Sequence, residues 1–175
     1  AGRLIGRADE LGRLRSLIFE TDGRILWLTG PAGIGKSYIV ARIAAEILDD
    51  PPSDTIVLPY RFKAGDERCT RRHFLQFAVE RLKAEGVVSG GGEDKGKQKR
   101  PLDELKGLLK SLDERRVLFI LDGLDEVALN DNRFAEDVPL SLTDANVTWL
   151  CAGRPEQGLP EAFSEERCTH VFPES

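Results

Sequence analysis

The chain has 175 residues, 41% of them hydrophobic, which suits a single α/β domain over residues 1–175 better than two compact domains. Its 25 Lys and Arg against 30 Asp and Glu give a net charge of -5, which argues against a domain that binds nucleic acid by neutralising phosphates. The sequence has no run of about 18 apolar residues, so we expect no membrane-spanning helix and a cytoplasmic location. It also has no Met, which favours a domain excised from a longer protein.

The first half of the chain predicts alternating helices and strands. Apolar spacing indicates a helix over residues 8–20, a strand over residues 25–28 and, after a loop, a helix whose apolar positions run from 39 to 48. A strand over residues 55–62 follows. Pro59 within it cannot donate a hydrogen bond to a neighbouring strand, so we expect this strand at an edge of the sheet.

The second half continues the alternation. Residues 86–100 are glycine-rich and charged with almost nothing to bury, which predicts a flexible surface loop within the domain. The other elements expected are helices over residues 70–84, 101–112 and 124–129, strands over 117–121, 147–152 and 168–172, and a loop with a short helix over 155–164. Five strands alternating with helices predict a parallel sheet with right-handed crossovers.

The loop after the first strand carries the most specific motif of the chain. It fits G-x-x-x-x-G-K-[ST] at every fixed position, between an apolar strand and an amphipathic helix. In such a loop the backbone amides turn toward phosphate oxygens, Lys36 reaches the β- and γ-phosphates, and the Ser37 hydroxyl takes a magnesium position. The expected nucleotide contacts are Gly30, Pro31, Ala32, Gly33, Ile34, Gly35, Lys36, Ser37 and Tyr38.

Acidic residues follow the apolar run 117–121. Asp122 ends this run, where its carboxylate could hold Mg²⁺ with Ser37, as the aspartate of other phosphate-loop enzymes does. Asp125 or Glu126 could orient the attacking water, and the residues leave open which of them does so. A plain Asp-Gly turn is the alternative, and the phosphate-loop motif elsewhere in the chain argues against it.

Arg154 follows the strand at residues 147–152, and Pro155 directs the chain away from the sheet. A guanidinium at a strand end could contact the γ-phosphate and thereby take part in catalysis. A surface arginine in a loop is the alternative, because a single arginine is a far less specific signal than the phosphate loop.

Together these motifs resemble the nucleotide-binding domain of STAND P-loop NTPases, most closely the NACHT group. The likeness rests on I-G-R-A-D-E-L at residues 5–11, the phosphate loop at 30–37, L-F-I-L-D-G-L-D-E at 118–126 and T-W-L-C-A-G-R-P at 148–155. The resemblance implies a three-layer α/β sandwich around a parallel sheet of order 2-3-4-1-5. It also implies that Arg154 acts as sensor 1 and that Leu4, Ile5, Gly6 and Arg7 lie against the adenine. The chain departs from the family's T-S-R-P, which here reads A-G-R-P at residues 152–155.

The resemblance implies a switch that uses ATP, ADP and Mg²⁺, hydrolyses ATP slowly and controls self-association in the full-length protein of a signalling or defence system. One alternative is a turnover ATPase of the AAA+ type acting on nucleic acid or protein, and another is the ATPase domain of a STAND transcription regulator. Asp125 and Glu126 stand three and four residues after Asp122 instead of directly beside it, and this spacing, together with the acidic net charge, favours the switch. We expect no direct nucleic-acid binding by this domain. The absence of an N-K-x-D guanine-reading sequence favours ATP over GTP.

Overall fold

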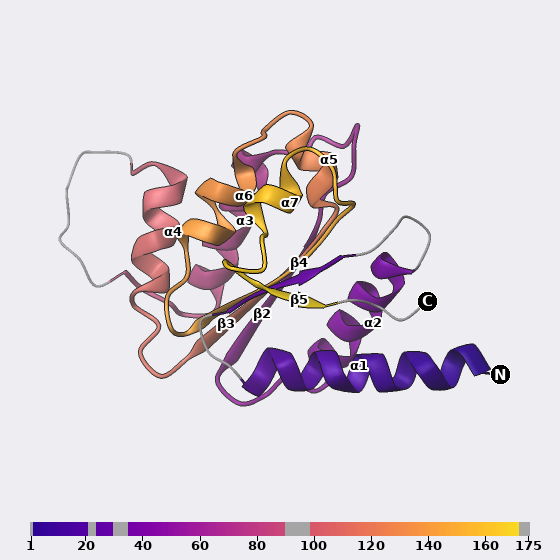
Figure 1. Ribbon diagram of the computed structural model, residues 1–175. Coiled ribbons are helices and arrows are strands. Elements are labelled where there is room, and N and C mark those ends of the chain that lie inside the picture. The colour runs from indigo at the N-terminus through magenta and orange to yellow at the C-terminus, as the bar shows by residue number, and fades with distance from the viewer. Residues whose placement is uncertain (1, 21–23, 30–34, 90–98, 172–175) are drawn as a thin grey trace.

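The computed structural model describes residues 2–20, 24–29, 35–89 and 99–171, with the backbone alone for residues 2–8. The described elements, in chain order, are α1 (Gly2–Glu20), β1 (Ile25–Leu28), α2 (Lys36–Asp49), β2 (Thr55–Arg61), α3 (Arg71–Ala84), α4 (Pro101–Leu109), β3 (Arg116–Asp122), α5 (Leu124–Ala128), α6 (Phe134–Asp137), the 3-10 turn η1 (Pro139–Ser141), β4 (Val147–Ala152), α7 (Leu159–Ala162) and β5 (Thr169–Val171). Helices cover both faces of one sheet, with α1 and α2 below it and the others above it in Figure 1.

The sheet has five parallel strands in the order β2-β3-β4-β1-β5, which confirms the order implied by the resemblance. β2 is an edge strand, as predicted from Pro59. An edge strand tolerates proline because its outer side has no neighbouring strand to which a backbone N–H must donate. β4 lies between β1 and β3 and pairs with both of them. The strand that precedes the phosphate loop is therefore separated from the strand that ends in Asp122 by the strand that leads to Arg154.

Alternate residues of β1, β2, β3 and β4 face two separate cores. Leu26, Ile120 and Leu150 pack against α1 and α2 on one face. On the other face Trp149 stacks on Phe119 with ring centroids 3.9 Å apart, and its indole Nε1 donates a 2.7 Å hydrogen bond to the Leu142 carbonyl. Burial on both faces explains why β3 is a continuous apolar run rather than an alternating one.

Some boundaries differ from those that the sequence predicted. α1 begins at Gly2, six residues before the predicted start, because Leu4, Ala8 and Leu11 continue the same helical spacing. α4 ends at Leu109 instead of residue 112, and α6 and η1 were not predicted. Most of the predicted flexible loop, residues 90–98, lies outside the described residues. Among the helices described, none is long and apolar enough to cross a bilayer.

Candidate functional site

A cavity of about 310 Å³ lies at the carboxyl ends of the strands. Ligands of open parallel sheets bind at this edge, because the loops there leave room between the strand ends. The described residues that line it are Gly35, Lys36, Ser37, Tyr38, Arg61, Phe62, Asp122, Gly123, Asp125, Glu126, Gly153 and Arg154. Lys36, Ser37, Asp122, Asp125, Glu126 and Arg154, each named from the sequence for a chemical role, thus line one cavity. Gly30–Ile34 lie outside the described residues.

The described end of the phosphate loop leads directly into α2. Gly35 adopts a left-handed conformation at φ 92°, and its carbonyl accepts a 3.0 Å hydrogen bond from the Ile39 amide in the first turn of the helix. Lys36 follows and is 8% exposed, the only charged side chain that is buried within the described part of the chain. Burial lowers the pKa of Lys36, while the negative charges of Asp125 and Asp122 act to raise it.

The turn after β3 places Asp122 against the end of β2. Asp122 pairs in register with Arg61, and its carbonyl accepts a 2.9 Å hydrogen bond from the Phe62 amide. Gly123 follows at φ 82°, and a Cβ added to it would lie 2.2 Å from the Phe62 carbonyl oxygen. No side chain fits there without moving the backbone. An acid directly after Asp122 is therefore sterically excluded in this structure, and the nearest acids in sequence are Asp125 and Glu126.

The loop after β4 rests on the first residues of α5. The Arg154 amide donates a 3.1 Å hydrogen bond to Asp125 Oδ1. Gly153 is buried beside it, and a Cβ added there would lie 3.1 Å from both the Asp125 nitrogen and Oδ1. Glu126 also lines the cavity, and its amide donates a 2.9 Å hydrogen bond to the Gly123 carbonyl. The Asp125 carboxylate thus accepts a hydrogen bond from the backbone of the loop that carries Arg154.

Mg²⁺ fits the oxygen atoms that the cavity offers. The ion prefers oxygen ligands and is usually held by one or two protein groups together with phosphates and water. The Ser37 hydroxyl and the Asp122 carboxylate line the same cavity and could supply such ligands. Among the described residues, at the cavity or away from it, no group of three or more His, Cys, Asp or Glu is placed to hold a metal ion by itself.

Four lining residues were not among the predicted site residues: Gly123 and Gly153, which lie inside the quoted motifs, and Arg61 and Phe62, which lie in none. Arg61 and Phe62 reach the cavity from the end of β2. The signal was present, because Arg61 and Phe62 are the last two residues of the predicted strand 55–62, and Asp122 and Arg154 follow the ends of two other predicted strands. Parallel strands end at one edge of a sheet. With Arg61 included, three basic side chains (Lys36, Arg61 and Arg154) face three acidic ones (Asp122, Asp125 and Glu126) among the described lining residues.

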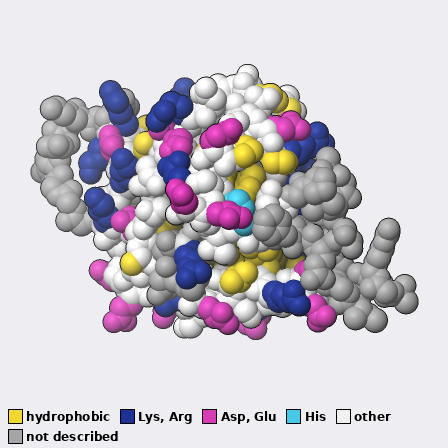
Figure 2. Space-filling model, in the orientation of Figure 1, with side chains coloured by type: hydrophobic (Ala, Val, Ile, Leu, Met, Phe, Trp, Pro, Cys, Tyr) yellow, Lys and Arg dark blue, Asp and Glu magenta, His cyan; other side chains and the backbone are white. Residues whose placement is uncertain are grey.

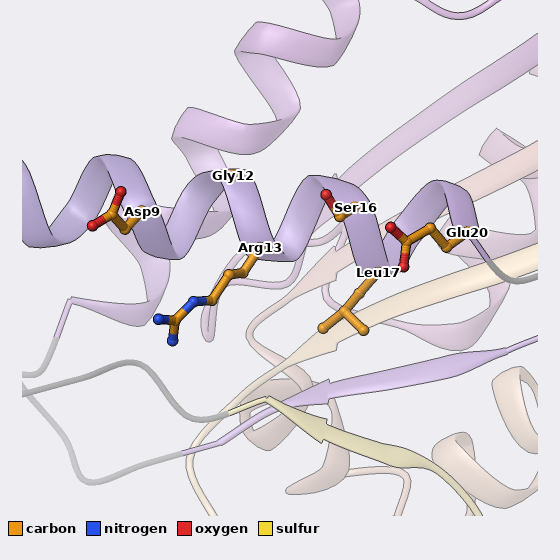
Figure 3. A pocket seen from close by; sticks show the side chains of 6 residues that line it. All are labelled: Asp9, Gly12, Arg13, Ser16, Leu17 and Glu20. Carbon is orange, nitrogen blue, oxygen red and sulfur yellow. The ribbon is translucent and has the colours of Figure 1, made fainter.

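The predicted adenine segment, Leu4–Arg7, lies within the first turns of α1, and its side chains are outside the described set. Its contact with the base stays a prediction. A larger hollow of about 620 Å³ runs along α1 itself, and Figure 3 shows the six residues that line it, including Asp9, Arg13 and Glu20. The described residues that line this hollow all belong to α1 and none of them comes from a strand end, so we place the chemistry at the smaller cavity.

A sequence model of the family described as "AAA ATPase domain" matches residues 3–145. No match was found among curated protein sequences. Solved structures with a similar fold include Drosophila ORC bound to DNA, with 13% identity over 95% of this chain and 87% of that one and a TM-score of 0.61. Another is Drosophila ORC bound to AT-rich DNA and Cdc6, with 14% identity, 97% and 56% coverage and a TM-score of 0.58. A third is Cdc6p from Pyrobaculum aerophilum, with 13% identity, 95% and 45% coverage and a TM-score of 0.59. The chain therefore spans about half the length of two of these three proteins.

Proposed function

Because the chain belongs to the AAA ATPase domain family, we propose that it binds ATP and ADP with Mg²⁺ and hydrolyses ATP. The observation that carries this proposal is the cavity that gathers Lys36, Asp122 and Arg154. Lys36 begins α2, the helix that follows β1, whereas Asp122 ends β3 and Arg154 follows β4. These three strands are consecutive in the sheet. A polyanionic phosphate chain requires this combination of an ammonium, a metal-binding carboxylate and a guanidinium.

Each lining residue has a role in this proposal. Lys36 binds the β- and γ-phosphates, and Arg154 contacts the γ-phosphate. Ser37 and Asp122 hold Mg²⁺, which neutralises charge that develops on the phosphates when it is bound. The acid pair supplies the group that orients the attacking water. Catalysis of phosphoryl transfer consists mainly of such positioning and charge stabilisation.

Two modes of action are compatible with this chemistry. Membership of the AAA ATPase family favours the turnover ATPase over the NACHT-like switch. The structure of the Asp122 turn favours slow hydrolysis, because Gly123 excludes an acid next to Asp122. We therefore propose an AAA-type ATPase whose nucleotide state controls self-association in a longer protein, with the NACHT-like signalling role as the second candidate.

Some solved neighbours are bound to DNA, and we propose that this domain by itself does not hold nucleic acid. Its net charge is -5, and Figure 2 shows basic side chains interspersed with acidic ones on the face in view. Fluorescence anisotropy with a labelled duplex at low salt tests this. Binding that weakens steeply as salt is added would contradict the proposal.

Calorimetric titration with ATPγS and ADP, with and without Mg²⁺, tests the main proposal. We expect Mg²⁺-dependent binding of the triphosphate that is lost in Lys36→Ala and kept in Lys110→Ala, a matched change of an exposed lysine. Single-turnover hydrolysis of ATP then separates the two modes, since a switch hydrolyses its ATP far more slowly than a turnover enzyme, whose median rate is on the order of 10 per second. Folded wild-type protein that binds neither nucleotide would overturn the proposal.

A further inference from the structure

The two acids after Asp122 differ in what their carboxylates contact. Asp125 Oδ1 accepts a hydrogen bond from the Arg154 amide, which belongs to a loop 29 residues further along the chain. Within the described part of the chain, Glu126 is held through its backbone amide, which donates a hydrogen bond to the Gly123 carbonyl of its own turn. Both side chains are half-buried and line the cavity. The difference assigns separate tasks to two acids that the sequence could not tell apart.

We propose that Asp125 is a positioning residue that fixes the Arg154 loop to the Asp122 turn, and that Glu126 is the acid that orients water. This inference rests on the proposed function, because it assigns roles within the nucleotide site. Asp125 acts through Arg154 rather than on the phosphates. Its bond links the strand end that holds Mg²⁺ to the loop that carries the γ-phosphate contact.

Gly153 supports this link by its size. Its φ lies outside the left-handed range, so backbone conformation alone does not require glycine there. Space favours glycine there, since a Cβ would approach the Asp125 nitrogen to 3.1 Å and the Leu124 nitrogen to 3.3 Å, and α5 would have to shift by a few tenths of an ångström. The buried glycine lets the Arg154 loop lie against the start of α5. Position 153 is serine in the T-S-R-P sequence and glycine in this chain. The glycine therefore permits the contact between the Arg154 loop and α5, because the Cβ of a serine would crowd the backbone of α5.

The hydrogen bond from the Arg154 amide also limits the chemistry that is open to the Asp125 carboxylate. One of its two oxygens is held by the Arg154 amide, and accepting a proton at that oxygen would compete with this bond. An asparagine at position 125 keeps a carbonyl oxygen that can accept the same bond and loses only the charge. An alanine loses the acceptor. Comparing Asp125→Asn with Asp125→Ala therefore distinguishes two roles of this residue. One is to hold the Arg154 loop, and the other is to orient the attacking water.

Hydrogen exchange of the Arg154 amide, followed by NMR without nucleotide, tests the contact itself. Arg154 is exposed, so its protection depends on the bond to Asp125. We expect Asp125→Ala to accelerate this exchange at least about tenfold, Asp125→Asn to change it by less than about threefold, and Gly153→Ala to accelerate it as well. Gly12→Ala, where the added Cβ meets nothing within 4 Å, should leave it unchanged. Unaltered Arg154 exchange in folded Asp125→Ala protein would overturn the inference.

Nucleotide measurements then test the consequence. Asp125→Ala should reduce the preference for ATPγS over ADP about tenfold, and Asp125→Asn should restore it, because the loop is held again. Glu126→Gln should keep the preference and slow single-turnover hydrolysis at least tenfold more than Asp125→Asn does. If Glu126→Gln and Asp125→Asn slow single-turnover hydrolysis equally, the division of roles is overturned. If wild-type protein binds no nucleotide, the proposed function fails while the exchange experiment still decides whether Asp125 holds the loop.

Discussion

Replacing Gly123 by Ala tests the contact between the Asp122 turn and β2. The added Cβ would lie 2.2 Å from the Phe62 carbonyl oxygen, closer than real Cβ contacts come, so β2 and β3 must separate there. The change also places a side chain at φ 82°, which costs about 1 to 2 kcal/mol. Overpacking adds about 1 to 3 kcal/mol, and weakening the Phe62 to Asp122 hydrogen bond adds about 0.5 to 1.5 kcal/mol. We expect the free energy of unfolding to fall by about 2.5 to 6.5 kcal/mol.

Urea denaturation, followed by far-UV circular dichroism and by fluorescence of the buried Trp27 and Trp149, measures this loss. Gly65→Ala is the matched control, because Gly65 has φ 83° and a Cβ there meets nothing within 4 Å. It should lose only the conformational cost of about 1 to 2 kcal/mol. Equal losses in the two variants would refute the steric argument and, with it, the exclusion of an acid at position 123.

Three further outcomes are expected. Asp122→Asn should remove most of the effect of Mg²⁺ on ATPγS affinity with little change in thermal stability, and calorimetry should show an undiminished Mg²⁺ effect if the role is wrong. Arg61→Ala should weaken ATPγS binding about tenfold and ADP binding less, because a guanidinium at the cavity wall contributes a charge-assisted bond to a phosphate; equal affinities would remove it from the site. Burial raises the pKa of the Cys168 thiol to about 11 from a usual 9.0, so its folded form binds the proton more tightly. Its alkylation rate, followed by mass spectrometry, should rise about tenfold per pH unit through pH 10, and levelling off near pH 9 would contradict this.

The sheet could be predicted because its signals are local. Continuous apolar runs marked β3 and β4, and Pro59 marked an edge strand before any pairing was known. Lys36 was identified from the phosphate-loop motif, and Asp122 and Arg154 from the rule that ligands of open parallel sheets bind at the carboxyl ends of the strands. The strand order itself came from the family resemblance and not from the residues.

Other parts of the structure depend on contacts between distant segments. α6 and η1 are four and three residues long, too short for a helical period to appear. The hydrogen bond from the Arg154 amide to Asp125 joins the loop after β4 to the start of α5, and it depends on the pairing of β3 with β4, so neither residue signals it alone. The reason for Gly123 was also hidden, because the sequence indicated a compact turn and not the carbonyl of Phe62 against it.

The balance of charges around the cavity has a consequence for the speed of nucleotide capture. The electrostatic fields of its three basic and three acidic described residues largely cancel at distances greater than a Debye length, which is about 8 Å at physiological ionic strength. A distant nucleotide therefore meets the field of the whole chain, whose net charge of -5 repels an anion. Association should accelerate slightly as salt screens this repulsion, whereas a basic cleft would lose its attraction. Affinity then depends on slow dissociation, through contacts that form only after the phosphates have arrived.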